Sequence, residues 1–353
     1  MASTVTYHEQ TDMENIRKLR EVLKTLPAFA KDYFRAIEPT TSTKTRISYA
    51  YDIRIFFQFL LSQNPVLSKT NITDINVSVL DQLQPVDIEE YMEYLKLYDH
   101  PDDQTAITNG ERGLKRKMSS LRSFYSYYYK RQAIQTNPTL LVDMPKIHDK
   151  TIIRLDAGET AALLDYIEHC GDQLSGQRKA YYEKTKVRDL AIVTLLLGTG
   201  IRVSECVGLD IDDIDFRNNG IRLVRKGGSE MVVYFGEEVE KALKSYLEAR
   251  KAIVPVAGHE NALFYSTQRK RIGVQAVENL VKKYAKAITT TKKITPHKLR
   301  STYGTALYQE TGDIYLVADV LGHKDVNTTK KHYAAMDDAR RRKAATAVHL
   351  RED

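Results

Sequence analysis

The sequence has few cysteines, few glycines and prolines, and no long apolar run, and each shortage excludes a class of protein. Among 353 residues only Cys170 and Cys206 are cysteines, too few for a disulfide framework. With 17 Gly and 9 Pro and no repeat, the chain is neither collagenous nor low in complexity. Its longest strongly apolar run, residues 190–197, is far below the ~20 residues that span a bilayer. Without a basic and then apolar leader, we expect a cytoplasmic protein with no membrane insertion.

Motifs for cofactors are missing as well. The chain has neither the Cys/His spacing of a zinc site nor the clustered carboxylates of a two-metal nuclease. It also has no Gly-x-x-x-x-Gly-Lys-Ser/Thr loop for a nucleotide. We therefore expect no metal and no other cofactor.

The charge balance is the first positive indication. Lys and Arg number 53 against 46 Asp and Glu, which gives a net charge of +7 and a pI near 9.0. This permits a polyanionic partner but does not establish one, because many basic proteins bind no nucleic acid.

The hydrophobic pattern divides the chain into two domains. Apolar residues recur at spacings of three and four in residues 49–60 and 114–128, so residues 14–135 are predicted to form a helical bundle with helices near 14–36, 87–98 and 111–131. The stretch 63–85 is predicted to be a loop. Residues 136–154 lose this periodicity and contain Pro138 and Pro145, which indicates a linker.

The second domain, residues 155–353, is predicted to mix helices with a small β-hairpin. A helix opens near Ala157, a polar stretch follows from 169 to 186, and residues 189–197 form a buried helix. Short β-rich runs at 221–224 and 231–235 flank Lys226-Gly227-Gly228, a pattern typical of a hairpin. Helices are expected near 236–252, 273–288, 298–311 and 313–321. The expected fold class is mainly α with a small sheet.

Basic residues gather in two places in the first domain. Residues 112–131 hold seven basic side chains on a helix whose other face is apolar, and Lys44 and Arg46 lie at a second helix start. A solvated charged face is the alternative to DNA binding, and we assign the tyrosines at 125–129 mainly to packing. The candidate DNA-binding residues are Lys44, Arg46, Arg112, Lys115, Arg116, Lys117 and Arg122.

Four segments of the second domain are candidates for parts of one site. They are Thr199-Gly200-Ile201-Arg202-Val203-Ser204-Glu205, Arg225-Lys226-Gly227-Gly228, Pro296-His297-Lys298-Leu299-Arg300, and Leu321-Gly322-His323 followed by Tyr333. Each segment alone is ordinary, since Gly-Thr-Gly loops, His-x-x-Arg pairs and isolated tyrosines occur in many proteins. Two guanidiniums suit the charge that builds on a phosphate under attack, and Arg202 and Arg300 fit that role.

In their order and spacing, these segments resemble the tyrosine recombinase (phage integrase) family, most closely the Xer recombinases of the single-recombinase XerS type. The resemblance implies a core-binding domain followed by a catalytic domain. It implies the catalytic residues Arg202, Lys226, His297, Arg300, His323 and Tyr333, with Glu205 orienting Arg202. Tyr333 would form a 3′-phosphotyrosyl link and Lys226 would protonate the leaving 5′-oxygen. Two positions depart from the family: Ser301 stands where His is common, and Tyr333 lies ten positions after His323 where nine are common.

The resemblance also implies partners. These are double-stranded DNA with inverted half-sites, a tetramer held by a C-terminal segment that docks on a neighbouring protomer, and an accessory protein for cell division or from a mobile element. Chromosome dimer resolution is the leading function. The alternatives are an integrase or excisionase of a phage or transposon, a topoisomerase-like enzyme, and a DNA-binding paralogue without catalysis. The first 13 or so residues are too short for the arm-binding domain that many mobile-element integrases carry, which favours the Xer interpretation.

Overall fold

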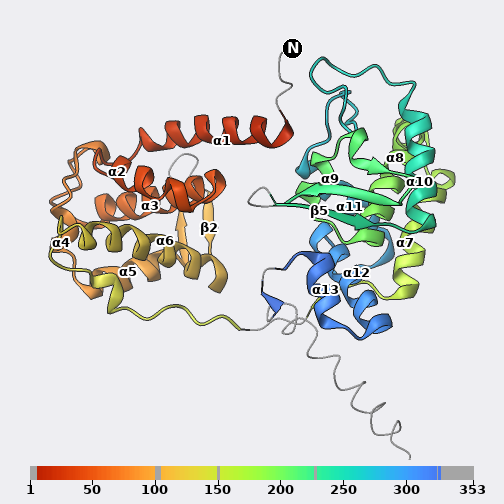
Figure 1. Cartoon of the computed structure of the whole chain (residues 1–353). Coiled ribbons are helices and arrows are strands. Elements are labelled where there is room, and N and C mark those ends of the chain that lie inside the picture. The colour runs from red at the N-terminus through yellow and green to blue at the C-terminus, as the bar shows by residue number, and fades with distance from the viewer. Residues whose placement is uncertain (1–5, 100–104, 149–151, 226–228, 324, 327–353) are drawn as a thin grey trace, which may run out of the picture. The chain divides into compact units, whose positions relative to one another are not determined.

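The computed structural model describes residues 6–99, 105–148, 152–225, 229–323 and 325–326, and the chain divides into two compact units (Figure 1). Unit 1 is Met1–Lys150 and unit 2 is Thr151–Asp353. The predicted fold class is confirmed, because both units are mainly helical and their sheets are small and antiparallel. The domain limits 14–135 and 155–353, with a linker at 136–154, stay a prediction.

Unit 1 is a helical bundle with one short hairpin. Its elements are α1 (Tyr7–Leu23), α2 (Ala30–Ala36), α3 (Thr43–Gln63), α4 (Val79–Gln82), α5 (Pro85–Tyr94), β1 (Leu97–Asp99), β2 (Ala106–Thr108) and α6 (Glu111–Lys130). The predicted single helix at 14–36 is wrong: a capping box of Thr6 and Glu9 starts α1 at Tyr7, and a turn at Pro27 separates it from α2. The end of the predicted helix at 87–98 is instead strand β1, paired with β2.

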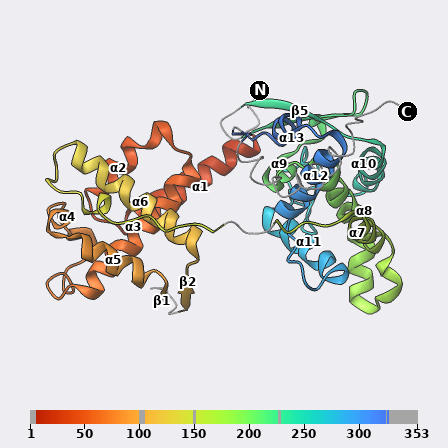
Figure 2. The same cartoon turned by 90° about the horizontal axis from the view of Figure 1, so that it is seen from below.

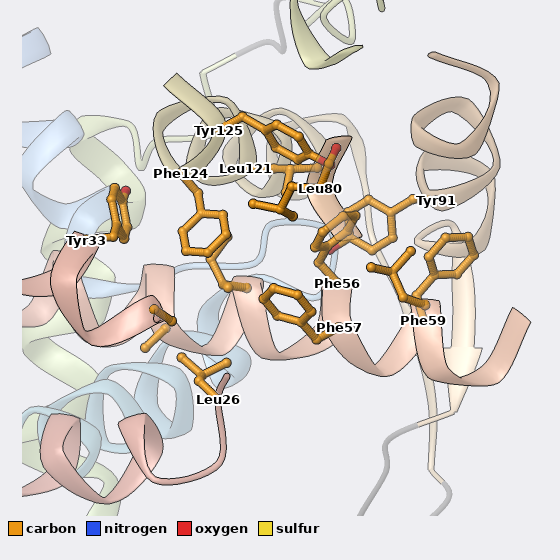
Figure 3. Packing of buried hydrophobic residues seen from close by; sticks show 14 of the residues in the cluster. Leu26, Tyr33, Phe56, Phe57, Phe59, Leu80, Tyr91, Leu121, Phe124 and Tyr125 are labelled. Atoms are coloured by element: carbon orange, nitrogen blue, oxygen red, sulfur yellow. The ribbon is translucent and has the colours of Figure 1, made fainter. Parts of the chain in front are cut away.

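The core of unit 1 is rich in aromatic side chains. Phe56 and Phe57 of α3 meet Phe124 and Tyr125 of α6, and all four are fully buried (Figure 3). The rings of Phe57 and Phe124 lie 6.0 Å apart, edge to face. Tyr128 is buried as well and Tyr127 packs partly buried against this core, whereas Tyr129 is 46% exposed. The assignment of the tyrosine cluster mainly to packing therefore holds for three of its four members.

Unit 2 is built around a long central helix, α8. Its elements are α7 (Ala157–His169), α8 (Gly176–Thr199), α9 (Val203–Gly208), β3 (Ile214–Asp215), β4 (Gly220–Val224), β5 (Glu230–Tyr234), α10 (Glu237–Arg250), α11 (Val274–Ile288), α12 (Pro296–Thr311) and α13 (Ile314–Leu321). The strand order is β3-β4-β5, and the predicted hairpin is present as β4 and β5, with Ile221 opposite Val233.

Helix α8 is longer than the sequence pattern predicts. Residues 176–186 of the predicted polar stretch form the first turns of α8, which are mostly exposed, although Tyr182 and Thr185 are buried. The apolar part is buried at residues 191–196, as expected. Helices α7, α10, α11 and α12 pack around α8 (Figure 1 and Figure 2). In the described part of the chain, no helix is both long and apolar enough to cross a bilayer.

Candidate active site

A glycine ends α8 and turns the chain toward the first candidate arginine. Gly200 has φ +64°, a left-handed conformation that favours glycine after a helix. A Cβ at Gly200 would lie 2.3 Å from Cδ1 of Tyr303, so a side chain is excluded by contact as well. Arg202 then occupies the N-cap position of α9. The turn at Gly200 therefore sets the position of the Arg202 backbone at the start of α9.

The carboxylate of Glu205 accepts hydrogen bonds from both the backbone and the guanidinium of Arg202. Its Oε2 accepts the backbone N–H of Arg202 at 2.7 Å, and its Oε1 accepts Nη1 at 2.8 Å. The Glu205 side chain is 5% exposed and that of Arg202 is 40% exposed. The carboxylate is thus buried beneath the guanidinium, which stays partly open to solvent. The role of Glu205 in orienting Arg202 stays a prediction.

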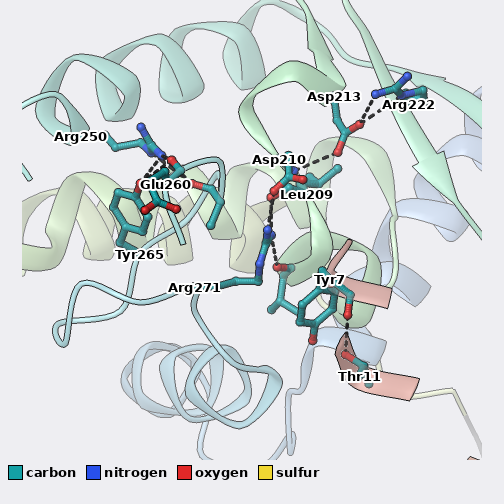
Figure 4. Close-up of polar contacts among 12 residues, drawn as sticks. Tyr7, Thr11, Leu209, Asp210, Asp213, Arg222, Arg250, Glu260, Tyr265 and Arg271 are labelled. Atoms are coloured by element: carbon teal, nitrogen blue, oxygen red, sulfur yellow. Dashed lines mark hydrogen bonds and ion pairs between the residues drawn. The ribbon is translucent and has the colours of Figure 1, made fainter. Parts of the chain in front are cut away.

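The far end of α9 is also fixed. Nη1 of Arg271 donates to the carbonyl oxygens of Val207, at 3.2 Å, and Leu209, at 2.8 Å, and the same side chain pairs with Asp210 (Figure 4). Sequence reasoning missed Arg271, because its backbone partners lie 62 and 64 residues away and its side-chain partner, Asp210, lies 61 residues away.

Arg300 lies in α12 and is almost completely buried. Its Nη1 donates to the carbonyl oxygen of Gly200 at 2.5 Å, and its Nη2 donates to that of Leu321. One guanidinium therefore joins the turn after α8 to the last residue of α13. The predicted clamp residues Arg202 and Arg300 are brought to the same place, because Nη2 of Arg202 donates to the next carbonyl oxygen, that of Gly322, at 3.2 Å.

The end of α13 positions His323. Gly322 is left-handed at φ +60°, and the N–H of His323 donates to the carbonyl oxygen of Ala318 at 2.9 Å, as in a Schellman cap. The cap and the two arginines together place the backbone of His323 beside the clamp. The exposed side chain of His297 lies in the first turn of α12 and borders a hollow of about 330 Å³ between α11 and α12.

Two of the predicted catalytic residues, Lys226 and Tyr333, lie outside the described residues. Their roles stay predictions. Among the described residues, no group of three or more His, Cys, Asp and Glu side chains is placed to hold a metal ion.

The seven predicted DNA-binding residues separate into two groups in unit 1. Lys44, Arg112 and Lys115 are exposed. The other four have partners within the protein: Arg46 pairs with Glu38 at 2.9 Å, Arg116 and Lys117 pair with Asp52, and Arg122 donates to the carbonyl oxygens of Thr139 and Val142. Arg46 and Lys117 are buried, while the Arg116 side chain is 46% exposed.

Asp52 pairs with two of these basic residues, Arg116 and Lys117. Its carboxylate is 1% exposed and accepts Nζ of Lys117 at 3.2 Å. Burial lowers the pKa of Lys117, and the carboxylate of Asp52 opposes that shift. Removing Asp52 would leave a buried ammonium without its counter-charge, so this pair belongs to the core of unit 1.

Comparisons with known proteins identify the family of the chain. The model of the Phage integrase family matches residues 154–340. The chain is 33% identical to tyrosine recombinase XerC of Caldanaerobacter subterraneus subsp. tengcongensis, over 94% of this chain and 90% of that protein. It is 31% identical to tyrosine recombinase XerS of Lactococcus lactis subsp. cremoris, over 90% and 93%. The fold resembles the crystal structure of XerH site-specific recombinase bound to palindromic difH substrate, with a TM-score of 0.66 at 19% identity, over 98% of this chain and 91% of that one.

Proposed function

Because this chain belongs to the phage integrase family of tyrosine recombinases, we propose that Tyr333 attacks a DNA phosphodiester and forms a 3′-phosphotyrosyl intermediate. The chain is a site-specific recombinase, and its substrate is DNA. The observation that carries the proposal is the meeting of Arg202 and Arg300 on the adjacent carbonyl oxygens of Gly322 and Leu321.

The two arginines are proposed to bind the non-bridging oxygens of the phosphate under attack. Negative charge builds on these oxygens in the transition state, and a guanidinium offers fixed donors and does not lose its proton. Glu205 keeps Arg202 in place before DNA arrives, so little reorganisation is needed. Preorganised charge of this kind is usually the largest single contribution to such catalysis.

The remaining step is an exchange of two bonds and two protons. The bond from Tyr333 Oη to phosphorus forms while the bond from phosphorus to O5′ breaks. The tyrosine proton leaves to a base, and Lys226 gives a proton to O5′. His297 is proposed to act in acid–base and hydrogen-bonding roles, and His323 to donate to the phosphate or to position Tyr333. Attack by a 5′-hydroxyl reverses the step, so rejoining needs no ATP.

The assembly is proposed to be a tetramer on two duplexes with inverted half-sites, in which residues 337–353 dock on a neighbouring protomer. Exchange of this segment around a ring is a heterologous interface. We propose chromosome dimer resolution as the biological role, supported by the Xer names of the relatives. The alternative, movement of a phage or transposon, is distinguished by mapping the genomic DNA that the protein protects after crosslinking.

The proposed chemistry is tested with a suicide substrate, a nicked site whose short cleaved strand diffuses away. The wild-type protein is expected to accumulate a covalent adduct with DNA in EDTA, because arginine and lysine neutralise the phosphate. The adduct is measured by denaturing electrophoresis. Absence of any adduct with a bound substrate would favour the non-catalytic paralogue, and a loss in EDTA that Mg²⁺ restores would contradict the metal-free step.

The role of Lys226 gives a second prediction. Lys226→Ala is expected to slow cleavage of ordinary DNA by about 10²- to 10⁴-fold, the range of general acid catalysis. Cleavage should recover on DNA whose 5′-bridging oxygen is sulfur, because a thiolate leaves without being protonated. The measurement is the single-turnover rate on both substrates.

A matched control for this lysine is Lys251→Ala, since Lys251 is exposed just after α10 and pairs only with Glu248 among the contacts described. This variant should cleave both substrates at the wild-type rate. If sulfur fails to restore cleavage by Lys226→Ala, the lysine does not protonate the leaving group.

A further inference from the structure

Three arginines from separate segments reach three successive carbonyl oxygens at the end of α13. Arg225 donates to the oxygen of Val320 at 2.9 Å, Arg300 to that of Leu321, and Arg202 to that of Gly322 at 3.2 Å. The C-terminal end of a helix carries partial negative charge, so it attracts cations. Two of these arginines are explained by the proposed phosphate clamp, and Arg225 is not.

Arg225 lies against Gly322 as well as against the helix end. A Cβ on Gly322 would lie 1.2 Å from Nη1 of Arg225 and 2.8 Å from its Nε, so the guanidinium occupies the space that a side chain would need. The backbone N–H of Arg225 donates to the carbonyl oxygen of Ser229 at 2.8 Å, which closes the base of the hairpin. This one residue therefore joins β4 to the cap of α13.

The placement is costly for Arg225. Burial lowers the pKa of its guanidinium, while the nearby carboxylate of Glu205 opposes the shift and Arg202 adds to it. Its Nε is buried and has no hydrogen-bond partner among the described residues. An unpaired buried donor destabilises a fold, so stability alone does not explain this arginine.

The contact of Arg225 with Gly322 affects the position of His323, the next residue in the chain. Its backbone position is set by the left-handed Gly322 and by the hydrogen bond to Ala318, and Arg225 covers this cap. We propose that Arg225 is a positioning residue that holds His323 in the place from which it acts on DNA. This inference rests on the proposed role of His323 in cleavage.

Arg225 is assigned to positioning because Arg202 and Arg300 already fill the proposed phosphate clamp and because its own contacts are with the protein. Nη2 is bonded to Val320, and Nη1 and Nε lie against Gly322. By contrast, the Arg202 side chain remains 40% exposed. An arginine that bound the phosphate directly would add its effect to that of His323, whereas one that acts through His323 would not.

The test is a double-mutant cycle of Arg225→Gln and His323→Ala, read as the single-turnover rate of adduct formation on the suicide substrate. Arg225→Gln is expected to slow cleavage ~10- to ~100-fold, as expected for a displaced catalytic group, with little change in half-site binding at fixed salt. In the His323→Ala background the same substitution should have no further effect.

Two further variants make the cycle decisive. Arg222→Gln is the matched control, because Arg222 lies on β4, which ends just before Arg225, but is exposed and pairs with Asp213 at 3.0 Å (Figure 4). This variant should leave cleavage unchanged. Arg225→Lys keeps the charge and can reach one carbonyl, so its defect should be smaller and should also vanish in the His323→Ala background. It replaces Arg225→Gln if the latter melts below the assay temperature.

The outcomes separate the inference from the function on which it rests. Equal slowing by Arg225→Gln in both backgrounds, or no slowing at all, overturns the positioning role. If His323→Ala alone cleaves at the wild-type rate, the proposed role of His323 fails, and the inference fails with it for that separate reason. Cleavage by every variant through Tyr333 would leave the proposed recombination chemistry untouched.

Discussion

Tyr333→Phe is expected to bind its DNA site as tightly as the wild type and to form no covalent adduct. The substitution removes one oxygen atom, the proposed nucleophile, and leaves the ring. Without a nucleophile the covalent path is lost, so cleavage should fall by ~10⁴-fold or more, as for other covalent catalysts that lose theirs. The measurement is adduct formation on the suicide substrate beside a gel-shift titration at fixed salt.

The chain offers a matched control for this loss. Tyr315 lies at the start of α13 and is 71% exposed, so Tyr315→Phe removes the same kind of atom, a tyrosine hydroxyl oxygen, from an exposed position. It should cleave at the wild-type rate. An adduct with Tyr333→Phe that appears at a normal rate would place the nucleophile elsewhere in the chain.

The sequence predicted the fold class well, because the strongest signals were local. Apolar residues recurring at three and four positions mark α3, α6 and the buried half of α8, and glycine with flanking β-branched residues marks β4 and β5. The extent of α8 was missed because its first turns are exposed and polar, and helical propensity without an apolar face leaves little periodic signal. The hairpin of β1 and β2 was missed because each strand has three residues.

The candidate site was predictable only in part, because some of its contacts join residues that lie far apart in the sequence. Motif spacing identified Arg202 and Arg300, and the structure brings both to the end of α13. Arg225 begins the Arg-Lys-Gly-Gly motif, but the motif does not predict what its side chain contacts. Its contacts are with the carbonyl oxygen of Val320 and with Gly322, and backbone partners almost a hundred residues away leave no trace in the local pattern.

The basic helix α6 shows a second limit of sequence reasoning. A run of basic residues in the sequence predicts a DNA-binding face. The sequence does not show which of these side chains extend into solvent and which pair with a buried carboxylate. Lys117 and Arg116 pair with Asp52, a single acid on α3, and only the folded structure reveals that pairing. The exposed Lys44, Arg112 and Lys115 therefore remain better candidates for phosphate contacts.

Arg300→Lys is expected to lose cleavage by ~10²- to ~10³-fold, the effect of removing one preorganised donor from a developing oxyanion. A lysine ammonium lacks the fixed, planar pair of donors with which Arg300 joins the carbonyl oxygens of Gly200 and Leu321, so we expect it to keep only one of these contacts. A buried carbonyl left unpaired should therefore also cost about 1–3 kcal/mol of folding stability. The free energy of unfolding and the single-turnover rate of cleavage are measured on the same preparation.

A control variant and a modified substrate separate the two expected effects of Arg300→Lys, the loss of cleavage and the loss of folding stability. Arg188→Lys changes another largely buried arginine of unit 2, which donates to Asp189 and to the carbonyl oxygen of Tyr265; it should lose stability without losing cleavage below its melting temperature. A methylphosphonate at the scissile position carries no formal charge, so a guanidinium that neutralises the phosphate becomes less necessary there. The ratio of wild-type to Arg300→Lys cleavage rates should then shrink by ~10-fold or more relative to ordinary DNA. An equal ratio on both substrates would mean that Arg300 only supports the turn after α8 and the end of α13, and that the phosphate is neutralised by other groups.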